Sequence, residues 1–401
     1  MAITATRADD VTVEALIDDP YPIYARLRRE SPTCFVPAVG LWFVTRWADV
    51  VAAAEDKAAF PASMAGSPLD RTLGGRNVLT VDGEEHEHWR SPMEATLRPR
   101  EVEAVAPSIV ERIANELIDG FLADGEADLK AVYCEPLAAS SLAEVIGLRG
   151  LSAPTLQRWF HDLATGTSNY EGDPAKQQVA DLTSSEIDAT LRPRLAELLE
   201  RPDGSMISAM LHAETGDLEE RMHAFMPTMK LALIGGLQEP ADGLGSTLAG
   251  ILGEDDQRDA FLDDPAGLAR RAVDEGIRWV SPIGTQGRAA GPGVSVAGVE
   301  IPEGEAVGLI IPSANRDEEV WGPTADAYDL FRARHANAAF GFGPHFCVGH
   351  QLARLQMRIG LRLLAERLPA LHLDLERPPV FRGWEYRGPV SLHARWPDRV
   401  R

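Results

Sequence analysis

The sequence is poor in cysteine and in long apolar runs, and each shortage excludes a class of protein. The 401-residue chain has three cysteines, Cys34, Cys134 and Cys347, which lie far apart. Their odd number and wide spacing fit neither a disulfide framework nor the CxxC spacing of a metal site. No run reaches the length of about 18 apolar residues that spans a bilayer. The opening residues, MAITATRADD, lack the charged-then-apolar order of a secretory signal. We therefore expect a cytoplasmic protein that does not bind membranes.

Positive charge is also scarce. The chain has 39 basic and 61 acidic residues, which gives a net charge of −22. A surface this negative repels phosphate backbones, so nucleic acid is not expected as a partner.

Most of the chain is predicted to be helical. Apolar residues recur at intervals of three and four over the ranges 101–123, 176–200 and 349–368. Short strands are predicted at 41–45, 294–299, 306–311 and 390–396. There is no internal repeat or long linker, so we expect residues 1–401 to form one domain of the mainly α (α+β) class with small β-sheets. A Gly- and Ser-rich loop from about 61 to 78 is a candidate lid.

The segment 340–349, FGFGPHFCVG, has the composition of a cofactor loop. Cys347 precedes a predicted amphipathic helix, whose dipole and free N–H groups favour the thiolate. Gly343 and Gly349 permit a tight turn or close approach to a flat cofactor. The flanking phenylalanines keep water from the sulfur. The alternative is a buried structural cysteine in a turn.

This segment resembles the haem-binding loop of cytochromes P450, Phe-x-x-Gly-x-His/Arg-x-Cys-x-Gly, with every required position filled. The resemblance covers nearly the whole chain. Glu275-Gly276-Ile277-Arg278, together with Arg332, is similar to the buried ion network of that family. The resemblance implies the cytochrome P450 fold and haem b (iron protoporphyrin IX), with Cys347 as the ligand of the iron.

The segment 82–90, DGEEHEHWR, resembles a second haem-contacting motif of the family. His86 and Arg90 lie four residues apart, so they share one face of a helix. By resemblance, His86, Arg90, Arg288 and His345 bind the two haem propionates, because buried carboxylates need paired donors. Without the cysteine loop, His86 and Arg90 would be read as a solvated helix face.

The helix that crosses the distal face of the haem is expected at about 220–253. Bacterial relatives commonly carry an acid and a threonine after its glycines, whereas this chain has Gln238 and Glu239 there. Pro240 lacks an N–H group, so the carbonyl of Gly236 loses its helical partner and the helix should open.

Glu239 lies one turn after Gly235, on the side expected to face the haem. Its carboxyl group would then enter an apolar cavity, where desolvation raises the pKa. Gly235 and Gly236 are expected to leave space for a small ligand. A helical glutamate more commonly points into solvent, and this alternative stays open.

The Gln-Glu-Pro sequence resembles a small group of P450s that O-demethylate lignin-derived methoxyphenols such as guaiacol and syringol, releasing formaldehyde. The resemblance implies Gln238 and Glu239 as catalytic residues. It implies a small aromatic substrate bordered by Leu73, Thr167, Leu231, Gly235, Ile283 and Tyr386. Thr167 is smaller than the aromatic residue of guaiacol-type pockets, which favours syringol with its second methoxy group.

Hydrogen peroxide is the expected oxidant, because a carboxyl group at Glu239 could move its proton from one oxygen to the other. A ferredoxin or flavin reductase is the other electron source considered. Two alternatives remain. One is an NAD(P)H-reductase-dependent monooxygenase that hydroxylates another small aromatic compound. The other is a haem-binding protein without turnover, which the missing acid–alcohol pair favours.

Overall fold

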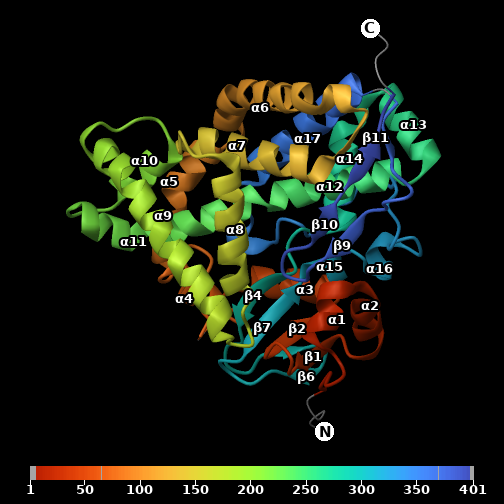
Figure 1. Cartoon of the computed structure of the whole chain (residues 1–401). Coiled ribbons are helices and arrows are strands. Elements are labelled where there is room, and N and C mark those ends of the chain that lie inside the picture. The colour runs from red at the N-terminus through yellow and green to blue at the C-terminus, as the bar shows by residue number, and fades with distance from the viewer. Residues whose placement is uncertain (1–5, 65, 369, 398–401) are drawn as a thin grey trace.

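The computed structural model describes residues 6–64, 66–368 and 370–397. Helices form most of the molecule, and the strands belong to small, separate sheets (Figure 1). The predicted mainly α architecture with small β-sheets is therefore confirmed.

The helices follow the predicted periodicity closely. Those of the first half of the chain are α1 (Val13–Asp18), α2 (Tyr21–Glu30), α3 (Trp47–Glu55), α4 (Pro68–Leu73), α5 (Gly83–Leu97), α6 (Pro99–Phe121), α7 (Glu135–Ile146), α8 (Ala153–Thr167) and α9 (Pro174–Glu200). Those of the second half are α10 (Met206–Ala213), α11 (Leu218–Leu237), α12 (Glu239–Leu252), α13 (Asp255–Asp263), α14 (Pro265–Trp279), α15 (Ile311–Ala314), α16 (Glu318–Trp321) and α17 (His350–Arg367). A π-helical turn at Lys130–Cys134 leads directly into α7.

The main sheet has the strand order β1–β2–β7–β4. Its strands are β1 (Thr33–Val36), β2 (Leu41–Val44), β4 (Thr285–Ala289) and β7 (Ala306–Ile310). β2 and β7 run parallel, and the two outer pairs are antiparallel. The smaller sheets consist of β3 (Glu126–Asp128), β8 (His372–Leu373) and β11 (His393–Arg395), of β9 (Val380–Arg382) and β10 (Gly388–Ser391), and of β5 (Ser295–Val296) and β6 (Val299–Glu300).

The predicted lid region differs from a plain loop. Pro68 and the following residues form the short helix α4, which ends at Gly74 in a left-handed conformation with φ +86°. Proline is common in the first turn of a helix and glycine is common at its end. Pro68 and Gly74 therefore indicated a short helix within the segment 61–78. Residue 65 of that loop lies outside the described residues.

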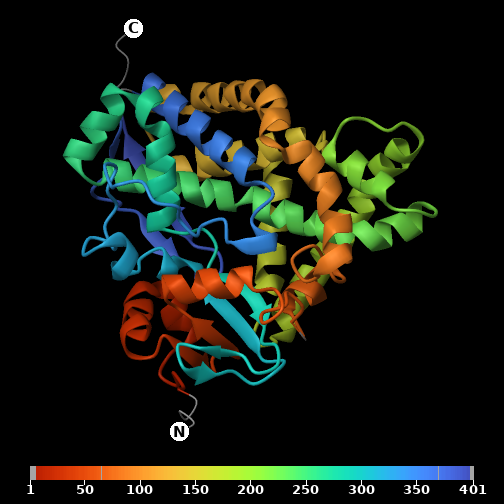
Figure 2. The same cartoon turned by 180° about the vertical axis from the view of Figure 1, so that it is seen from behind.

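The main sheet and the first three helices lie at one end of the molecule, and α6, α7 and α17 lie at the other (Figure 1). Between them α11 and α12 cross the molecule, as the view from behind also shows (Figure 2). Asp217 begins α11 with a capping box, in which its carboxylate accepts from the N–H of Glu220 and Glu220 accepts from the N–H of Asp217. α12 packs against α14 and α17. These helices surround the largest apolar core.

A buried ion network fixes α14. The guanidinium of Arg278 pairs with Glu275 at 2.7 Å and also donates to the carbonyl oxygens of Asn315 and Ala325. Arg332 reaches the same carboxylate at 3.1 Å. The predicted association of these three charged residues is confirmed. Among the described residues, no helix is long and apolar enough to cross a membrane.

Candidate haem and substrate site

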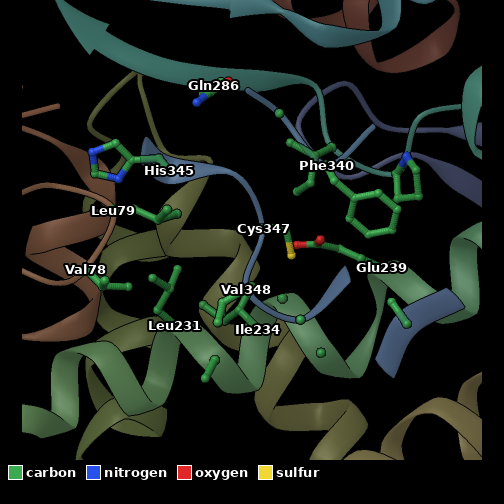
Figure 3. A pocket seen from close by; sticks show the side chains of 18 of the residues that line it. Val78, Leu79, Leu231, Ile234, Glu239, Gln286, Phe340, His345, Cys347 and Val348 are labelled. Atoms are coloured by element: carbon green, nitrogen blue, oxygen red, sulfur yellow. The ribbon is translucent and has the colours of Figure 1, made fainter. Parts of the chain in front are cut away.

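A cavity of about 330 Å³ lies between the distal helices, the cysteine loop and the main sheet. Side chains from α11, α12, β4 and the segment around Tyr386 border it, together with Cys347 (Figure 3). Apolar groups form most of the wall, and the polar groups are concentrated at a few positions. This composition is typical of a site for a small, mainly apolar ligand.

The loop that carries Cys347 is tightly folded against the rest of the chain. Gly343 has φ +70°, and a Cβ atom there would lie 2.2 Å from the carbonyl oxygen of Ala54. Only glycine fits such a position. The N–H group of Cys347 donates to the carbonyl oxygen of Phe340 at 3.0 Å. Cys347 thereby lies at the cavity, a short turn before α17.

The helix start alone does not give Cys347 a low thiol pKa, contrary to the expectation from the sequence. Burial raises the pKa of Cys347 to about 11, and the charge of Glu239 acts in the same direction. The N–H group of Gly349 opposes this effect without reversing it. Desolvation of a thiolate is thus the larger effect in this protein. A metal ion bound to the sulfur would supply the missing charge, since a coordinating thiol is deprotonated outright.

Three buried nitrogen atoms, two on residues that line the cavity and one on a residue packed beside them, have no hydrogen-bond partner among the described residues. They are His86 Nε2, His345 Nδ1 and Arg288 Nη2. The rings of His86 and His345 lie 4.4 Å apart. A buried nitrogen without a partner costs about 1–3 kcal/mol, so the group fits an anionic ligand such as a pair of carboxylates. Haem, with its two propionates, meets that requirement.

The other contacts hold these side chains in place. His345 Nε2 lies 3.0 Å from Asp82 Oδ1. Arg90 lines the cavity and donates to Glu94 and to the carbonyl oxygen of Phe346. Burial, together with the positive charges of His345 and Arg90, lowers the pKa of His86 to about 4. The structure therefore brings together His345, Arg288 and Arg90 at the cavity and places His86 directly behind His345.

The distal helix is broken where Pro240 predicts. α11 ends at Leu237 and α12 begins at Glu239, with Gln238 between them at φ −107° and ψ −41°. The chain resumes its helical hydrogen bonding when the N–H group of Asp242 donates to the carbonyl oxygen of Gln238.

Glu239 faces the cavity from this break. A Cβ atom on Gly235 would lie 3.5 Å from Glu239 Oε1, so the carboxyl group packs against the bare backbone one turn earlier. In Figure 3 the side chain of Glu239 extends toward Cys347. Burial raises the pKa of Glu239 to about 8, and the charge of Asp242 adds to this effect. The solvent-facing alternative is wrong for this residue.

The expectation about Gln238 needs correction. Gln238 turns away from the cavity, and its amide donates to Asp242 at 3.0 Å and to Glu135 at 3.3 Å. Gly236 borders the cavity as expected, and a Cβ atom there would also lie 2.6 Å from Leu142 of α7. The absence of a side chain at Gly236 therefore permits close helix packing in addition to leaving space for a ligand.

Most of the expected substrate residues line the cavity. These are Thr167, Leu231, Gly235, Ile283 and Tyr386. The hydroxyl groups of Thr167 and Tyr386 lie 3.0 Å apart and share a hydrogen bond. Leu73 is the exception. It is fully buried in the helical core, because α4 presents Pro68 and Leu69 to the cavity, next to the N-cap residue Ser67, and turns Leu73 away from it.

Sequence reasoning missed a polar group on the cavity wall. Tyr170, Thr285 and Glu385 line the cavity and hydrogen bond to one another. Glu385 belongs to the segment 383–389, GWEYRGP, in which the resemblance assigned a role to Tyr386 and none to Glu385. Its alternation of glycine, aromatic and charged residues was the available signal.

Comparisons with known proteins agree with this geometry. The profile of the Cytochrome P450 family matches residues 267–379. Nocardicin C N-oxygenase of Nocardia uniformis subsp. tsuyamanensis is 31% identical, over 94% of this chain and 96% of that protein. Cytochrome P450 107B1 of Saccharopolyspora erythraea is 30% identical, over 90% of each chain. The crystal structure of CalO2 superposes with a TM-score of 0.86 at 24% identity, covering 98% of this chain and 100% of that one, and supports the fold. The chain therefore belongs to the cytochrome P450 family and is a monooxygenase, an oxidoreductase that binds haem b through a cysteine thiolate.

Proposed function

We propose that this P450 catalyses the oxidative O-demethylation of methoxyphenols of the syringol and guaiacol type, releasing formaldehyde, and that hydrogen peroxide can serve as its oxidant. The observation that carries the proposal is the position of Glu239. Its carboxyl group faces the cavity from a break in the distal helix, next to the bare backbone of Gly235.

In this proposal Cys347 is the ligand of the haem iron. Arg90, Arg288 and His345 hold the propionates, with His86 behind them, because they supply unpaired or cavity-facing donors. When bound, a haem-thiolate supplies the chemistry that oxidises an unactivated C–H bond. The protein must then position one methoxy methyl group of the substrate in the cavity and transfer one proton of the peroxide.

The cavity wall suits a flat ring with oxygen substituents. Leu231 and Ile283 offer apolar contact for the ring. Thr167 and Tyr386 present hydroxyl groups where a second oxygen substituent could lie. The short side chain of Thr167 leaves room there, which favours syringol over guaiacol.

The overall reaction balances with peroxide as the only co-reactant. One C–H bond of the methoxy group becomes C–OH, and the resulting hemiacetal breaks its C–O bond to give a phenol and formaldehyde. Peroxide supplies the inserted oxygen and leaves as water, so the ether and one hydrogen peroxide yield the phenol, formaldehyde and one water. No further electron donor is required.

Glu239 has the position to move the proton that this chemistry needs. A carboxyl group in a largely apolar cavity can take a proton from one oxygen of peroxide and return it to the other. Gln238 cannot share this task, because its amide is turned toward Asp242 and Glu135.

Adding hydrogen peroxide and syringol to the purified holoprotein tests the proposal, with formaldehyde as the readout. Glu239→Gln should lower peroxide-driven turnover at least tenfold, since general acid–base catalysis contributes about 10²–10⁴-fold. Glu303→Gln, at an exposed position before β7, is the matched control and should keep the wild-type rate.

The result also separates the alternatives. Product that forms only with a reductase and NAD(P)H would contradict the peroxide route and favour a reductase-dependent monooxygenase. Oxidation of the ring without formaldehyde would favour a hydroxylase of another small aromatic compound. Bleaching of the haem without any product would favour a haem-binding protein without turnover.

A further inference from the structure

A carboxylate is built into the substrate side of the cavity without a positive partner. Glu385 is buried, with 8% of its surface exposed, and it lines the cavity. None of the ion pairs formed by the described residues includes it. Its partners are instead hydroxyl groups, since Thr285 Oγ1 lies 2.9 Å from both carboxylate oxygens and Tyr170 also hydrogen bonds to it.

The backbone holds Glu385 in a fixed place. The N–H group of Gly284 donates to the carbonyl oxygen of Glu385 at 2.9 Å, and Ile283 and Tyr386 form a β-bridge. A Cβ atom on Gly284 would lie 1.9 Å from the carbonyl oxygen of Trp384, so a glycine there is required for this close approach. The segment around Glu385 is therefore locked onto the start of β4.

The hydrogen bonds of Glu385 leave one acceptor position free. An ionised carboxylate has about four lone-pair sites. Thr285 fills one with its hydroxyl and one with its backbone N–H group, and Tyr170 fills another. The remaining site belongs to a side chain that borders the cavity, so it is available to a ligand.

We propose that Glu385 accepts a hydrogen bond from a phenolic hydroxyl group of the substrate and makes the cavity selective for free phenols over their methyl ethers. This inference rests on the proposed function, which it refines by naming the substrate group that is recognised. A methyl ether has no proton to donate, so it would leave the buried acceptor unpaired. A site built to pair a hydroxyl group rejects analogues that lack it far more strongly than an apolar pocket rejects a methyl group.

Other ligand groups fit the site less well. An ammonium ion brings three donors, but the neighbouring hydroxyl groups of Thr167 and Tyr386 already bond to each other. A carboxylate ligand would meet the charge of Glu385. A phenol brings one donor to one free acceptor. Burial also raises the pKa of Glu385 to about 7, with the hydrogen bonds from Thr285 and Tyr170 opposing this shift, so the carboxylate is available above neutral pH.

Binding rather than turnover tests the inference. The probes are syringol and 1,2,3-trimethoxybenzene, which differ by one O-methyl group, titrated into the holoprotein at pH 8 by calorimetry. The wild-type protein should bind syringol at least tenfold more tightly, because a hydrogen bond to a charged acceptor is stronger than one to a neutral acceptor. Glu385→Gln should weaken syringol binding at least fivefold and leave the ether within twofold. Ile234→Val, on the apolar part of the wall, should keep the wild-type preference.

A second variant keeps the test interpretable if Glu385→Gln does not fold. Glu385→Asp keeps the charge but withdraws it by one methylene group, and it should also reduce the preference for the phenol. Haem content and thermal unfolding check that each variant folds. Equal affinity of the wild-type protein for both probes would overturn the inference, as would an unchanged preference in both variants. Failure to release formaldehyde would refute the proposed function, yet the preference and its loss in Glu385→Gln would still be measurable.

Discussion

The ammonium group of Lys130 forms a buried ion pair with the carboxylate of Asp242, in the first turn after the break in the distal helix. Both side chains are nearly inaccessible, at 3% and 7% exposure. Glu135 lies 3.6 Å from the same ammonium group, and the amide of Gln238 bonds to both acids. The cluster thus joins the π-helical turn at Lys130–Cys134 to the helix break, so one irregularity of the backbone fixes the other.

Replacing Lys130 should destabilise the protein strongly. Lys130→Met leaves the charges of Asp242 and Glu135 buried without a cation, which costs about 3–5 kcal/mol. Urea unfolding of the holoprotein measures the change. Lys176→Met removes an exposed pair with Glu171 and should cost about 0–1 kcal/mol. If both variants lost a similar free energy of unfolding, the buried cluster would stabilise the protein no more than an exposed ion pair does.

Cys347→Ser should abolish the absorbance at about 450 nm of the reduced carbonyl complex, because that band requires a thiolate ligand. Cys134→Ala, which removes another buried cysteine, should retain the band. A Cys347→Ser protein with an unchanged spectrum would show that a different residue ligates the iron.

Thr167→Phe should lower the turnover of syringol more than that of guaiacol. The larger ring would fill the space beside Tyr386 that the second methoxy group needs. Formaldehyde release from each substrate gives the two rates. Thr165→Phe, two residues earlier on α8, is the control and should affect neither substrate selectively. Equal losses in Thr167→Phe would mean that Thr167 does not border that methoxy group.

The raised pKa of Glu385 should make the stability of the protein depend on pH. Its pKa is raised from 4.5 to about 7, so the folded protein binds a proton more tightly than the unfolded chain. The associated stability is present in full below pH 4.5 and is lost as the pH rises through 7. Thermal unfolding should therefore show that, between pH 5 and pH 8, the wild-type protein loses more stability than Glu385→Gln does. A constant difference between the two proteins would contradict the raised pKa.

The sequence predicts what is local. The helix break follows from the missing N–H group of Pro240, and the position of Glu239 follows from its spacing from Gly235. The turn of the cysteine loop can also be predicted from the sequence, because the turn itself requires its glycines. These features depend on residues within a few positions of one another.

The features that the sequence does not predict depend on residues that are far apart along the chain. Gln238 donates to Asp242, one turn further along the chain, and to Glu135, which is distant in the sequence, and the sequence around Gln238 does not indicate this second acceptor. Leu73 was misplaced because the orientation of the short helix α4 depends on packing against α8 and α11. The thiol pKa of Cys347 depends on how completely the surrounding fold excludes water, which the helix start alone does not determine.

The bridge between Ile283 and Tyr386 joins two segments that lie far apart along the chain. Contacts of such long sequence separation form late, because the entropy of closing the intervening loop opposes them until other structure is present. We therefore expect the substrate wall to be assembled late in folding. A ligand bound against Tyr386 stabilises only the finished structure, so it should slow unfolding and leave the rate of refolding unchanged.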